Sequence, residues 1–361
     1  MLFSKKILDW FSEYGRSLPW RGIDDPYKIW LSEIILQQTR IEQGREYYFR
    51  FIEQYPTVVH LAQASEEDVL KTWQGLGYYS RARNLHASAR YIAAELQGRF
   101  PTSYEGILAL KGVGRYTAAA IASFAYRLPY PVIDGNVYRF VSRLFGIDTP
   151  IGTDAAYKEF ETLLSRLIDR DRPDLFNHAM MDFGSTYCKP TGCDCDHCIF
   201  YNECVARKEG RVELLPVKGS GAKVKTRWFY YVYISWNEGD RPYTMMHRRE
   251  GKDIWKGLYE FPLIETGEPL SDAEAMERGR QLAVSMGFDG VECFRTVGPV
   301  KHQLTHRTIV ASMVCLAATG TPKQMQGEGA IAIDKAHNYP ISRLMEILTE
   351  RLGWPKEKDE G

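Results

Sequence analysis

The sequence predicts two regions of different fold class, an all-α region followed by a smaller α+β domain. From Ser4 to about Pro216, apolar residues recur at spacings of three and four, which is typical of amphipathic helices. After a basic, glycine-containing stretch at residues 217–227, aromatic and β-branched runs typical of strands take over. We therefore expect a helical region over residues 1–216, a linker over 217–227, and a second domain over 228–361.

The composition is that of a globular chain. Of its 361 residues, 44% are hydrophobic and 25% are charged. The 46 acidic and 46 basic residues cancel, so the total charge neither favours nor excludes a nucleic-acid partner. No apolar run approaches the length of a membrane span. We expect a soluble, monomeric, intracellular protein of the cytoplasm or nucleoid, with no membrane partner.

Among the early helices, the stretch from Tyr27 to Arg40 combines a broad apolar face with one carboxylate, Glu33. Most helix glutamates lie on the solvent side. In a cleft, however, desolvation raises the pKa of such a group and suits it to deliver a proton near neutral pH. Both interpretations remain open. Helices are also expected over Glu46–Tyr55 and Ser65–Gln74.

The next break, Gly75–Arg83, reads GLGYYSRAR and mixes glycine, adjacent tyrosines and arginines. These residue types supply flexible backbone, stacking faces and cations that pair with phosphates. A solvated turn with one packed tyrosine explains the same composition equally well.

The stretch Leu110–Arg139 contains two tight turns, each followed by a helix. Gly112 and Gly114 form the first turn, and the free amides of the following helix suit one anion such as a DNA phosphate. Lys111 and Arg115 add positive charge there. The second turn carries Asp134, which fits either a plain helix N-cap or a functional carboxylate. The alternative for the whole stretch is a helical hairpin without a ligand.

Five of the seven cysteines are crowded after a predicted helix over Asp174–Tyr187. In a chain with no recognisable secretion signal, crowding favours metal binding over disulfides. Four thiolates suit a tetrahedral zinc or a cubane iron–sulfur cluster, and the extra Cys193 and His197 keep zinc open. The four that give the spacing C-x6-C-x2-C-x5-C are Cys188, Cys195, Cys198 and Cys204.

Beyond the linker, strand-like runs and two helical segments predict the α+β domain. The strand candidates are Trp228–Trp236, Tyr243–His247, Val291–Val297 and Thr308–Ala317. The helix candidates are Ser271–Met286 and Ile341–Leu352.

Taken together, these motifs resemble the helix-hairpin-helix base-excision glycosylases, and most closely the adenine DNA glycosylases of the MutY type. The resemblance runs over nearly the whole chain. It implies a helix-hairpin-helix region with a [4Fe–4S] loop, followed by a Nudix, MutT-like domain. Its partner would be double-stranded DNA with adenine opposite 8-oxoguanine. The motifs are LPWR (18–21), WLSEIILQQTR (30–40), GLGYYSRAR (75–83), LKGVGRYTA (110–118), DGNV (134–137) and the cysteine loop.

The resemblance also implies roles for single residues. Glu33 would protonate the adenine ring, Asp134 would face the developing sugar cation, and Asn136 and Tyr116 would support them. This pairing agrees with the chemistry, because expelling adenine needs one protonated and one ionised carboxyl, so we expect their environments to separate the two pKa values. The target base must also leave the duplex.

The DNA-binding residues follow in the same way. Gln38, with Thr39 beside it, and Tyr78 would enter the duplex, while Trp20 and Arg21 would form part of the adenine pocket. His178 departs from the family, which commonly has glutamine or glutamate at this position. It either bonds the base or packs as an ordinary helix residue.

In the second domain, Leu304, Thr305 and His306 occupy the place of the Phe-Ser-His loop that reads the lesion in this family. Leu304 replaces an aromatic residue. The domain also lacks the glutamate-rich Nudix helix that holds magnesium, so we expect binding and not hydrolysis.

Two other functions remain in view. An endonuclease III-like glycosylase with strand-cutting activity carries a catalytic lysine where this chain has Tyr116, and the nearby Lys111 does not match that position. A non-catalytic iron–sulfur DNA-binding protein would not need both Glu33 and Asp134.

Overall fold

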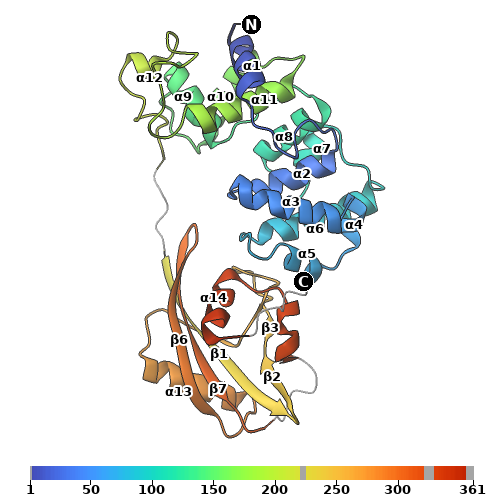
Figure 1. The fold of residues 1–361 in the computed structure, drawn as a ribbon, viewed down its shortest axis with the longest axis vertical. Helices are drawn as coiled ribbons and strands as arrows, with labels where there is room; N and C mark the ends of the chain where they lie inside the picture. Colours follow the sequence, from blue (N-terminus) through green and yellow to red (C-terminus); the bar gives the residue numbers. More distant parts are fainter. Residues whose placement is uncertain (1, 220–224, 321–328, 355–361) are drawn as a thin grey trace. The chain divides into compact units, whose positions relative to one another are not determined.

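The computed structural model describes residues 2–219, 225–320 and 329–354. The chain divides into two units, which are coloured along the sequence in Figure 1. The first comprises Met1–Gln63 and Asn84–Gly221, and the second comprises Ala64–Arg83 and Ala222–Gly361. Part of the predicted linker, residues 220–224, lies outside the described residues.

Helices build the first unit. Helix α1 packs against α11 and α2 packs against α8. One core of this unit joins residues of α1, α9, α10 and α11, with Phe140, Phe176 and Phe183 among its buried members. The helices are α1 (Leu2–Tyr14), α2 (Pro26–Leu36), α3 (Ile41–Gln54), α4 (Val58–Gln63), α6 (Ser80–Glu95, which starts in the second unit), α7 (Tyr104–Leu108), α8 (Arg115–Tyr126), α9 (Gly135–Phe145), α10 (Asp154–Leu167), α11 (Pro173–Asp182), the π-helical turn η1 (Phe183–Tyr187) and α12 (Val205–Lys208).

Two helix ends differ from the sequence-based expectation. The helix predicted over Tyr27–Arg40 ends at Leu36, because Gln38 takes a left-handed conformation with φ +56°. The Thr39 N–H then bonds the carbonyl of Leu36 at 3.2 Å and closes a turn. The helix predicted over Asp174–Tyr187 becomes α11 followed by η1, and π-helical turns of this kind are frequent at functional sites.

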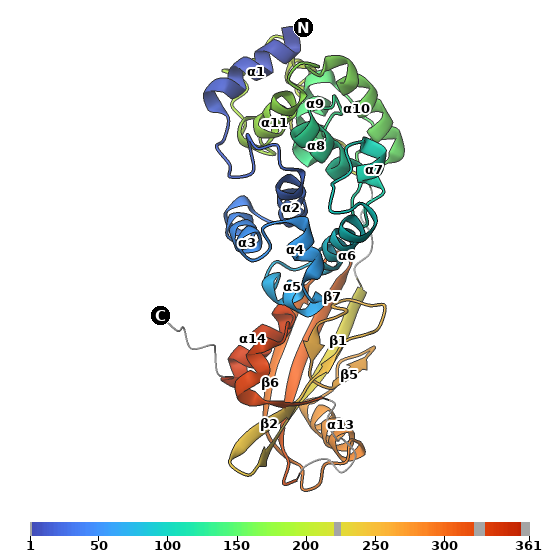
Figure 2. The same ribbon diagram turned by 90° about the vertical axis from the view of Figure 1, so that its right-hand side faces the viewer.

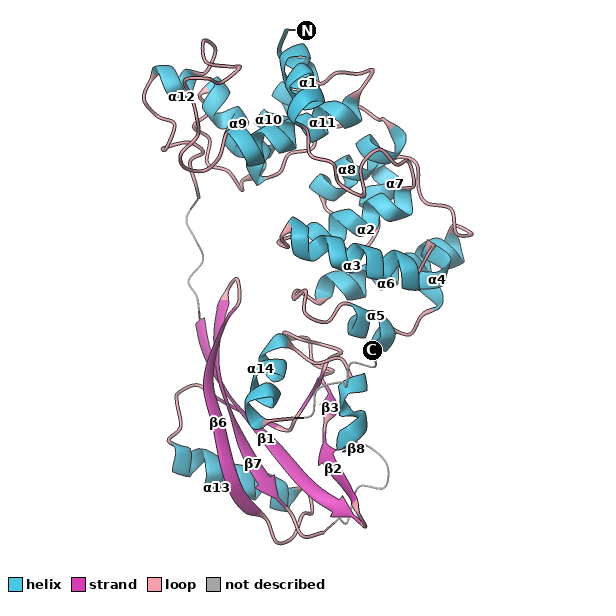
Figure 3. Cartoon of the chain, viewed as in Figure 1, coloured by secondary structure: helices cyan, strands magenta, loops and turns pink. Residues whose placement is uncertain are grey.

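A mixed sheet forms the centre of the second unit, and Figure 3 shows its strands in magenta. The strand order is β6-β7-β1-β2-β8, with β5 also paired to β1. Strands β1 and β7 run parallel, and the other pairs of this sheet are antiparallel. The strands are β1 (Lys225–Glu238), β2 (Arg241–Met245), β3 (His247–Arg248), β4 (Tyr259–Glu260), β5 (Leu263–Thr266), β6 (Glu292–Gln303), β7 (Arg307–Ala317) and β8 (Ala330–Ala332), with β3 and β4 forming a separate pair.

Helices cover both faces of this sheet, α13 (Asp272–Ser285) on one and α14 (Arg343–Leu352) on the other (Figure 2). The side chains of strand β1 explain why both faces are covered. Val232, Ile234 and Trp236 pack in the cluster of α13, whereas the alternating Tyr231 and Tyr233 pack in the cluster of α14. The predicted α+β class is confirmed.

The segment Ala64–Arg83, which contains α5 (Glu66–Thr72), packs in the second unit although it lies early in the chain. Gln74 Nε2 bonds Glu346 Oε1 at 2.6 Å, and the Tyr79 hydroxyl donates to the carbonyl of Ile341 at 3.0 Å. No helix of the described residues is long and apolar enough to cross a membrane.

Candidate active site and DNA-binding elements

Glu33 is buried in α2, a helix capped by Asp25 and buried around most of its circumference. Only 6% of the residue is exposed, so the cleft interpretation holds and the solvent-side one is wrong. The Tyr116 hydroxyl donates a hydrogen bond of 2.8 Å to Glu33 Oε2. Burial raises the pKa of Glu33 from 4.5 to about 7, even though the Tyr116 bond favours the charged form.

Asp134 is the N-cap of α9. Its Oδ1 accepts from the Val137 N–H at 2.7 Å, and its Oδ2 accepts from Asn136 Nδ2 at 2.7 Å. Burial raises the pKa of Asp134, whereas these bonds and Arg139 oppose the rise. Burial thus acts in the same direction on both carboxyls, and the groups that stabilise the charged form are more numerous at Asp134.

The two carboxyls line one cavity. Glu33, Tyr116 and Asp134 face it together with Gln38, and its wall is completed by Leu36, Gln37 and Ile133. The charge of Asp134 contributes to the raised pKa of Glu33, so the pair is electrostatically coupled. One cavity is thus lined both by a carboxyl with a pKa near 7, Glu33, and by a carboxyl that accepts two hydrogen bonds, Asp134.

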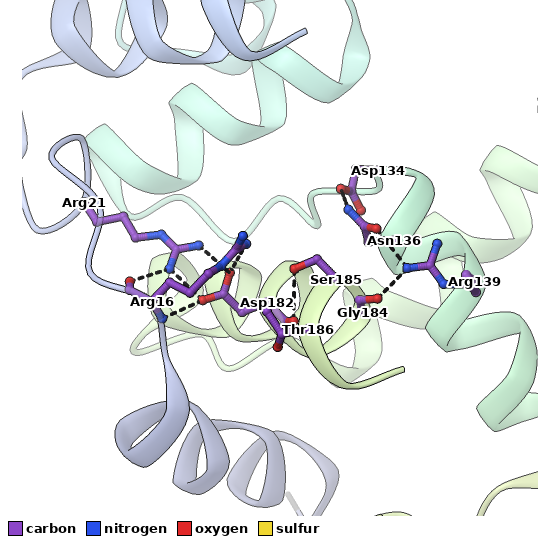
Figure 4. Close-up of polar contacts among 9 residues, drawn as sticks. All are labelled: Arg16, Arg21, Asp134, Asn136, Arg139, Asp182, Gly184, Ser185 and Thr186. Atoms are coloured by element: carbon purple, nitrogen blue, oxygen red, sulfur yellow. Dashed lines mark hydrogen bonds and ion pairs between the residues drawn. The ribbon is translucent and has the colours of Figure 1, made fainter. Parts of the chain in front are cut away.

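Asn136 is held in place by Arg139, one turn further along α9 (Figure 4). Arg139 Nη2 donates to Asn136 Oδ1 at 2.9 Å and also to the carbonyl of Gly184, while its Nε donates to the carbonyl of Cys188. Gly184 must be glycine, because a Cβ there would lie 2.6 Å from the carbonyl oxygen of Asn136. At this contact the η1 turn packs closely against the start of α9.

A buried ion-pair network lies at the end of α11 (Figure 4). The Asp182 side chain is fully buried and accepts hydrogen bonds from Arg16 and from Arg21, the latter at 2.7 and 2.8 Å. Burial alone would raise the pKa of Asp182, but the two guanidinium groups lower it to about 2. The network fixes the chain between α1 and α2 to α11.

A second cavity is lined by Trp20, Arg21 and His178. Burial, with the Arg21 and Arg16 charges, lowers the pKa of His178 to about 3, so its ring is neutral at pH 7. The ring stacks on Phe124 with a centroid separation of 3.9 Å. His178 Nδ1 and Arg21 Nε are buried without a hydrogen-bond partner among the described residues.

The predicted hairpin precedes α8. Gly112 has φ +81°, and a Cβ there would lie 2.6 Å from Asn84 Cβ, so only glycine fits. Gly114 is the N-cap of α8, with open space around it and no side-chain cap. The first amides of α8 are therefore available to an anion. Lys111 is exposed beside them, whereas Arg115 pairs with Asp154 at 2.9 Å.

The remaining DNA-binding candidates are divided between the units. Gln38, with φ +56°, is exposed in the first unit. In the second unit Tyr78 is 47% exposed with φ +48°, and its hydroxyl lies 3.1 Å from Thr305 Oγ1. Thr305 and the exposed His306 form the turn between β6 and β7. Leu304 is half-buried and packs against the core.

The cysteine loop surrounds one cavity. All five thiols, Cys193 included, line it beside Arg143, Phe140 and Phe183. No three His, Cys, Asp or Glu side chains within the described ranges converge as a single ion would require. Thiols gathered on one cavity are soft sulfur ligands, which both zinc and iron–sulfur clusters take.

Sequence reasoning missed Arg16, Arg139, Asp182 and Gly184. Arg139 had a local signal, since it lies three positions after Asn136 on one helix. The contacts of Arg16 and Gly184 join residues far apart in the chain, which no local pattern reveals.

Comparison with known proteins agrees with this geometry. Residues 31–167 match the HhH-GPD superfamily base excision DNA repair protein model, and residues 231–351 match the NUDIX domain model. A solved thermostable thymine-DNA glycosylase is 28% identical, with a TM-score of 0.54 over 58% of this chain and 96% of its own. A trapped endonuclease III–DNA intermediate, 22% identical with a TM-score of 0.50, covers 57% of this chain and 94% of its own and shares the fold.

Two named relatives extend the match. The adenine DNA glycosylase of Buchnera aphidicola subsp. Schizaphis graminum is 34% identical over 73% of this chain and 76% of that protein. The adenine DNA glycosylase of Rattus norvegicus is 39% identical over 59% of this chain and 44% of its own. With both domain types matched in order and the two carboxyls on one cavity, the chain belongs to the adenine DNA glycosylase family.

Proposed function

We propose that this chain is a monofunctional DNA glycosylase that removes adenine mispaired with 8-oxoguanine, or with guanine, in duplex DNA. The observation that carries the proposal is the cavity shared by Glu33 and Asp134, in which burial raises the pKa of Glu33 to about 7. A group with that pKa is partly protonated at neutral pH and can still give up its proton. The identity of the excised base, adenine, is inferred from the relatives, which are named adenine DNA glycosylases.

In the proposed mechanism, Glu33 donates its proton to a ring nitrogen of the flipped adenine. The base then leaves as a neutral molecule while positive charge develops on the sugar. Asp134 faces that charge, and Asn136 and Arg139 orient Asp134. Tyr116 holds the Glu33 carboxyl through their 2.8 Å bond.

Two features support a glycosylase without strand-cutting activity. Tyr116 stands where an endonuclease III-like enzyme carries its lysine, and no lysine is among the residues that line the described Glu33–Asp134 cavity. An amine is needed to form a Schiff base with the opened sugar. A non-catalytic binder, the other alternative, would have no use for a buried carboxyl pair.

The hairpin at Gly112 and Gly114 would bind the DNA backbone, and exposed side chains would intercalate in the duplex. The free amides of α8 at Gly114 fit one phosphate, and the exposed Lys111 adds charge. Gln38 and Tyr78 are both exposed, and both take a left-handed backbone conformation that is uncommon for residues other than glycine. By resemblance to the family, Gln38, with Thr39 beside it, and Tyr78 would each intercalate in the duplex from which the adenine is flipped. Trp20, Arg21 and His178 would complete the adenine pocket.

Lesion reading is assigned to the turn between β6 and β7. Thr305 is exposed and within 3.1 Å of the Tyr78 hydroxyl, so one hydrogen-bonding group and one stacking face come together within the second unit. His306 is exposed beside them. Leu304 packs inward, so it would shape this turn and leave base contact to its neighbours.

For the cysteine loop we propose a [4Fe–4S] cluster held by Cys188, Cys195, Cys198 and Cys204. The four thiols line one cavity, and the buried Arg143 places a positive charge beside them. When bound, such a cluster crosslinks the loop and contributes no step to base removal. An intracellular, monomeric enzyme fits a duplex substrate and a catalytic pair that lies within one unit.

The test is adenine release from duplexes with adenine opposite 8-oxoguanine, measured under single turnover before and after alkali. We expect strand breaks only after alkali, because no amine opens the sugar. Breaks before alkali would favour the endonuclease III-like alternative. Tight binding without release would favour the non-catalytic one.

A further inference from the structure

We propose that Cys193 is a reserve ligand of the iron–sulfur cluster, able to replace Cys195 at one of its corners. This inference rests on the cluster proposed above. The four-cysteine spacing leaves Cys193 without a role, yet its thiol lines the same cavity as the other four. A cubane cluster has four protein ligands, so one of the five thiols is surplus.

Three of the thiols are fixed by the helical core. Cys188, Cys198 and Cys204 pack against the cluster of buried residues that includes Phe140, Phe183 and Phe200. These three corners cannot move without disturbing that core. The exchange must therefore take place at the fourth corner, in the loop that carries Cys193 and Cys195.

Cys193 and Cys195 are close neighbours on that loop, with their Sγ atoms 4.0 Å apart. Cys193 Sγ also lies 3.5 Å from Arg143 Nη1, the same nitrogen that lies 3.5 Å from Cys188 Sγ. Arg143 is only 3% exposed. Cys193 and Cys188 therefore share one buried donor group, so the Cys193 sulfur lies beside the same side chain as a proposed ligand.

The backbone of the loop permits the exchange. Gly192 has φ +64°, and residues 191, 192, 194 and 196 are exposed outside any helix or strand. A shift of this segment therefore moves mainly exposed side chains. The Cys193 thiol would release its proton to solvent and bind iron through sulfur, while displaced Cys195 would take up a proton. No electron is transferred.

Four full-length variants test the proposal through iron content and the visible absorbance of the cluster. We expect Cys195→Ser to keep most of the wild-type iron, because Cys193 takes over. Cys198→Ser, the matched control at a fixed corner, should lose it, as should the double variant Cys193→Ser/Cys195→Ser. Cys193→Ser alone should be unchanged. Loss of iron in Cys193→Ser would make Cys193 the resident ligand and overturn the reserve role.

Alkylation by iodoacetamide gives a second, activity-independent readout, with Cys293 in β6 as an internal standard. Cys193 should be alkylated in the native wild-type protein and protected in Cys195→Ser. Loss of iron in Cys195→Ser equal to that in Cys198→Ser, continued alkylation of Cys193, or an insoluble Cys195→Ser beside a soluble Cys193→Ser would each overturn the proposal. Wild-type protein that carries zinc in place of iron would instead refute the cluster itself.

Discussion

Burial has two linked effects on Glu33. It keeps the carboxyl partly protonated near neutral pH, and it lowers the stability of the folded state when the carboxyl is ionised. The folded-state pKa of about 7 exceeds the ordinary value of 4.5, so the native state keeps a proton that the unfolded chain releases. Stability therefore falls as pH rises from about 4.5 to about 7. The raised pKa that would suit Glu33 to proton donation therefore lowers the stability of the folded state above about pH 4.5.

We predict that Glu33→Gln stabilises the protein at pH 8 by roughly 2–4 kcal/mol, and by much less at pH 4.5. Denaturant unfolding at both pH values measures this. Glu46→Gln on the exposed side of α3 is the control and should show no such pH dependence beyond the loss of a weak pair with Arg50. An equal effect of Glu33→Gln at both pH values would contradict the assignment.

Tyr116 affects the pKa of Glu33. Because its hydroxyl donates to Glu33 and favours the charged form, its removal should raise the pKa of Glu33 further. In the proposed mechanism adenine release requires protonated Glu33, so the wild-type single-turnover rate should fall as pH rises through about 7. In Tyr116→Phe that fall should move to higher pH. A fall that stays in place or moves lower would show that the hydroxyl does not act on Glu33.

At the scale of elements, much of the fold follows from sequence pattern. Three- and four-residue periodicity gives the helices, and alternation along β1 gives a strand with two buried faces. The early end of α2 was not predictable, because the residues after Leu36, 37–40, include no glycine or proline that would end a helix. The π-helical end of α11 was not predictable either, because periodicity does not distinguish a π-helical turn from a further α-helical one. Gln38 adopts its left-handed conformation without a glycine signal.

The hairpin offers a matched pair of glycines for a prediction about the element. Gly112→Ala should destabilise the fold by at least about 1–2 kcal/mol, since its φ is positive and a Cβ would clash with Asn84. Gly114→Ala should leave the fold nearly unchanged, because φ is −96° and the space is open, while weakening duplex binding. Thermal unfolding and duplex titration separate the two effects. Equal destabilisation by both would refute the distinction.

At the scale of the whole molecule, the proposed catalytic pair, Glu33 and Asp134, lies in the first unit, whereas Tyr78 lies in the second with Thr305. Sequence reasoning assigned Ala64–Arg83 to the helical region because its pattern is helical. The hydrogen bonds to Glu346 and Ile341 that place it in the second unit join residues more than 260 positions apart, and no local pattern encodes them.

A chain truncated after Lys218 should therefore still release adenine opposite guanine. Its preference for 8-oxoguanine over guanine should fall by about tenfold to hundredfold, because one hydrogen-bonded base contact is worth about 1–3 kcal/mol. It should also be less stable than the full chain, because the partners of Gln74 and Tyr79 are gone. Competition between the two mispairs measures the preference. Unchanged discrimination would place lesion reading in the first unit, with Gln38 the next residue to test.

The most direct test of the account compares binding with chemistry in Glu33→Gln. On duplexes with adenine opposite 8-oxoguanine, the variant should bind within a few-fold of wild type, because the substitution leaves the proposed phosphate site at Gly112 and Gly114 unchanged. Its single-turnover release of adenine should fall by about 10²–10⁴-fold, the usual contribution of a general acid. Release at the wild-type rate would remove Glu33 from the mechanism and contradict the central claim.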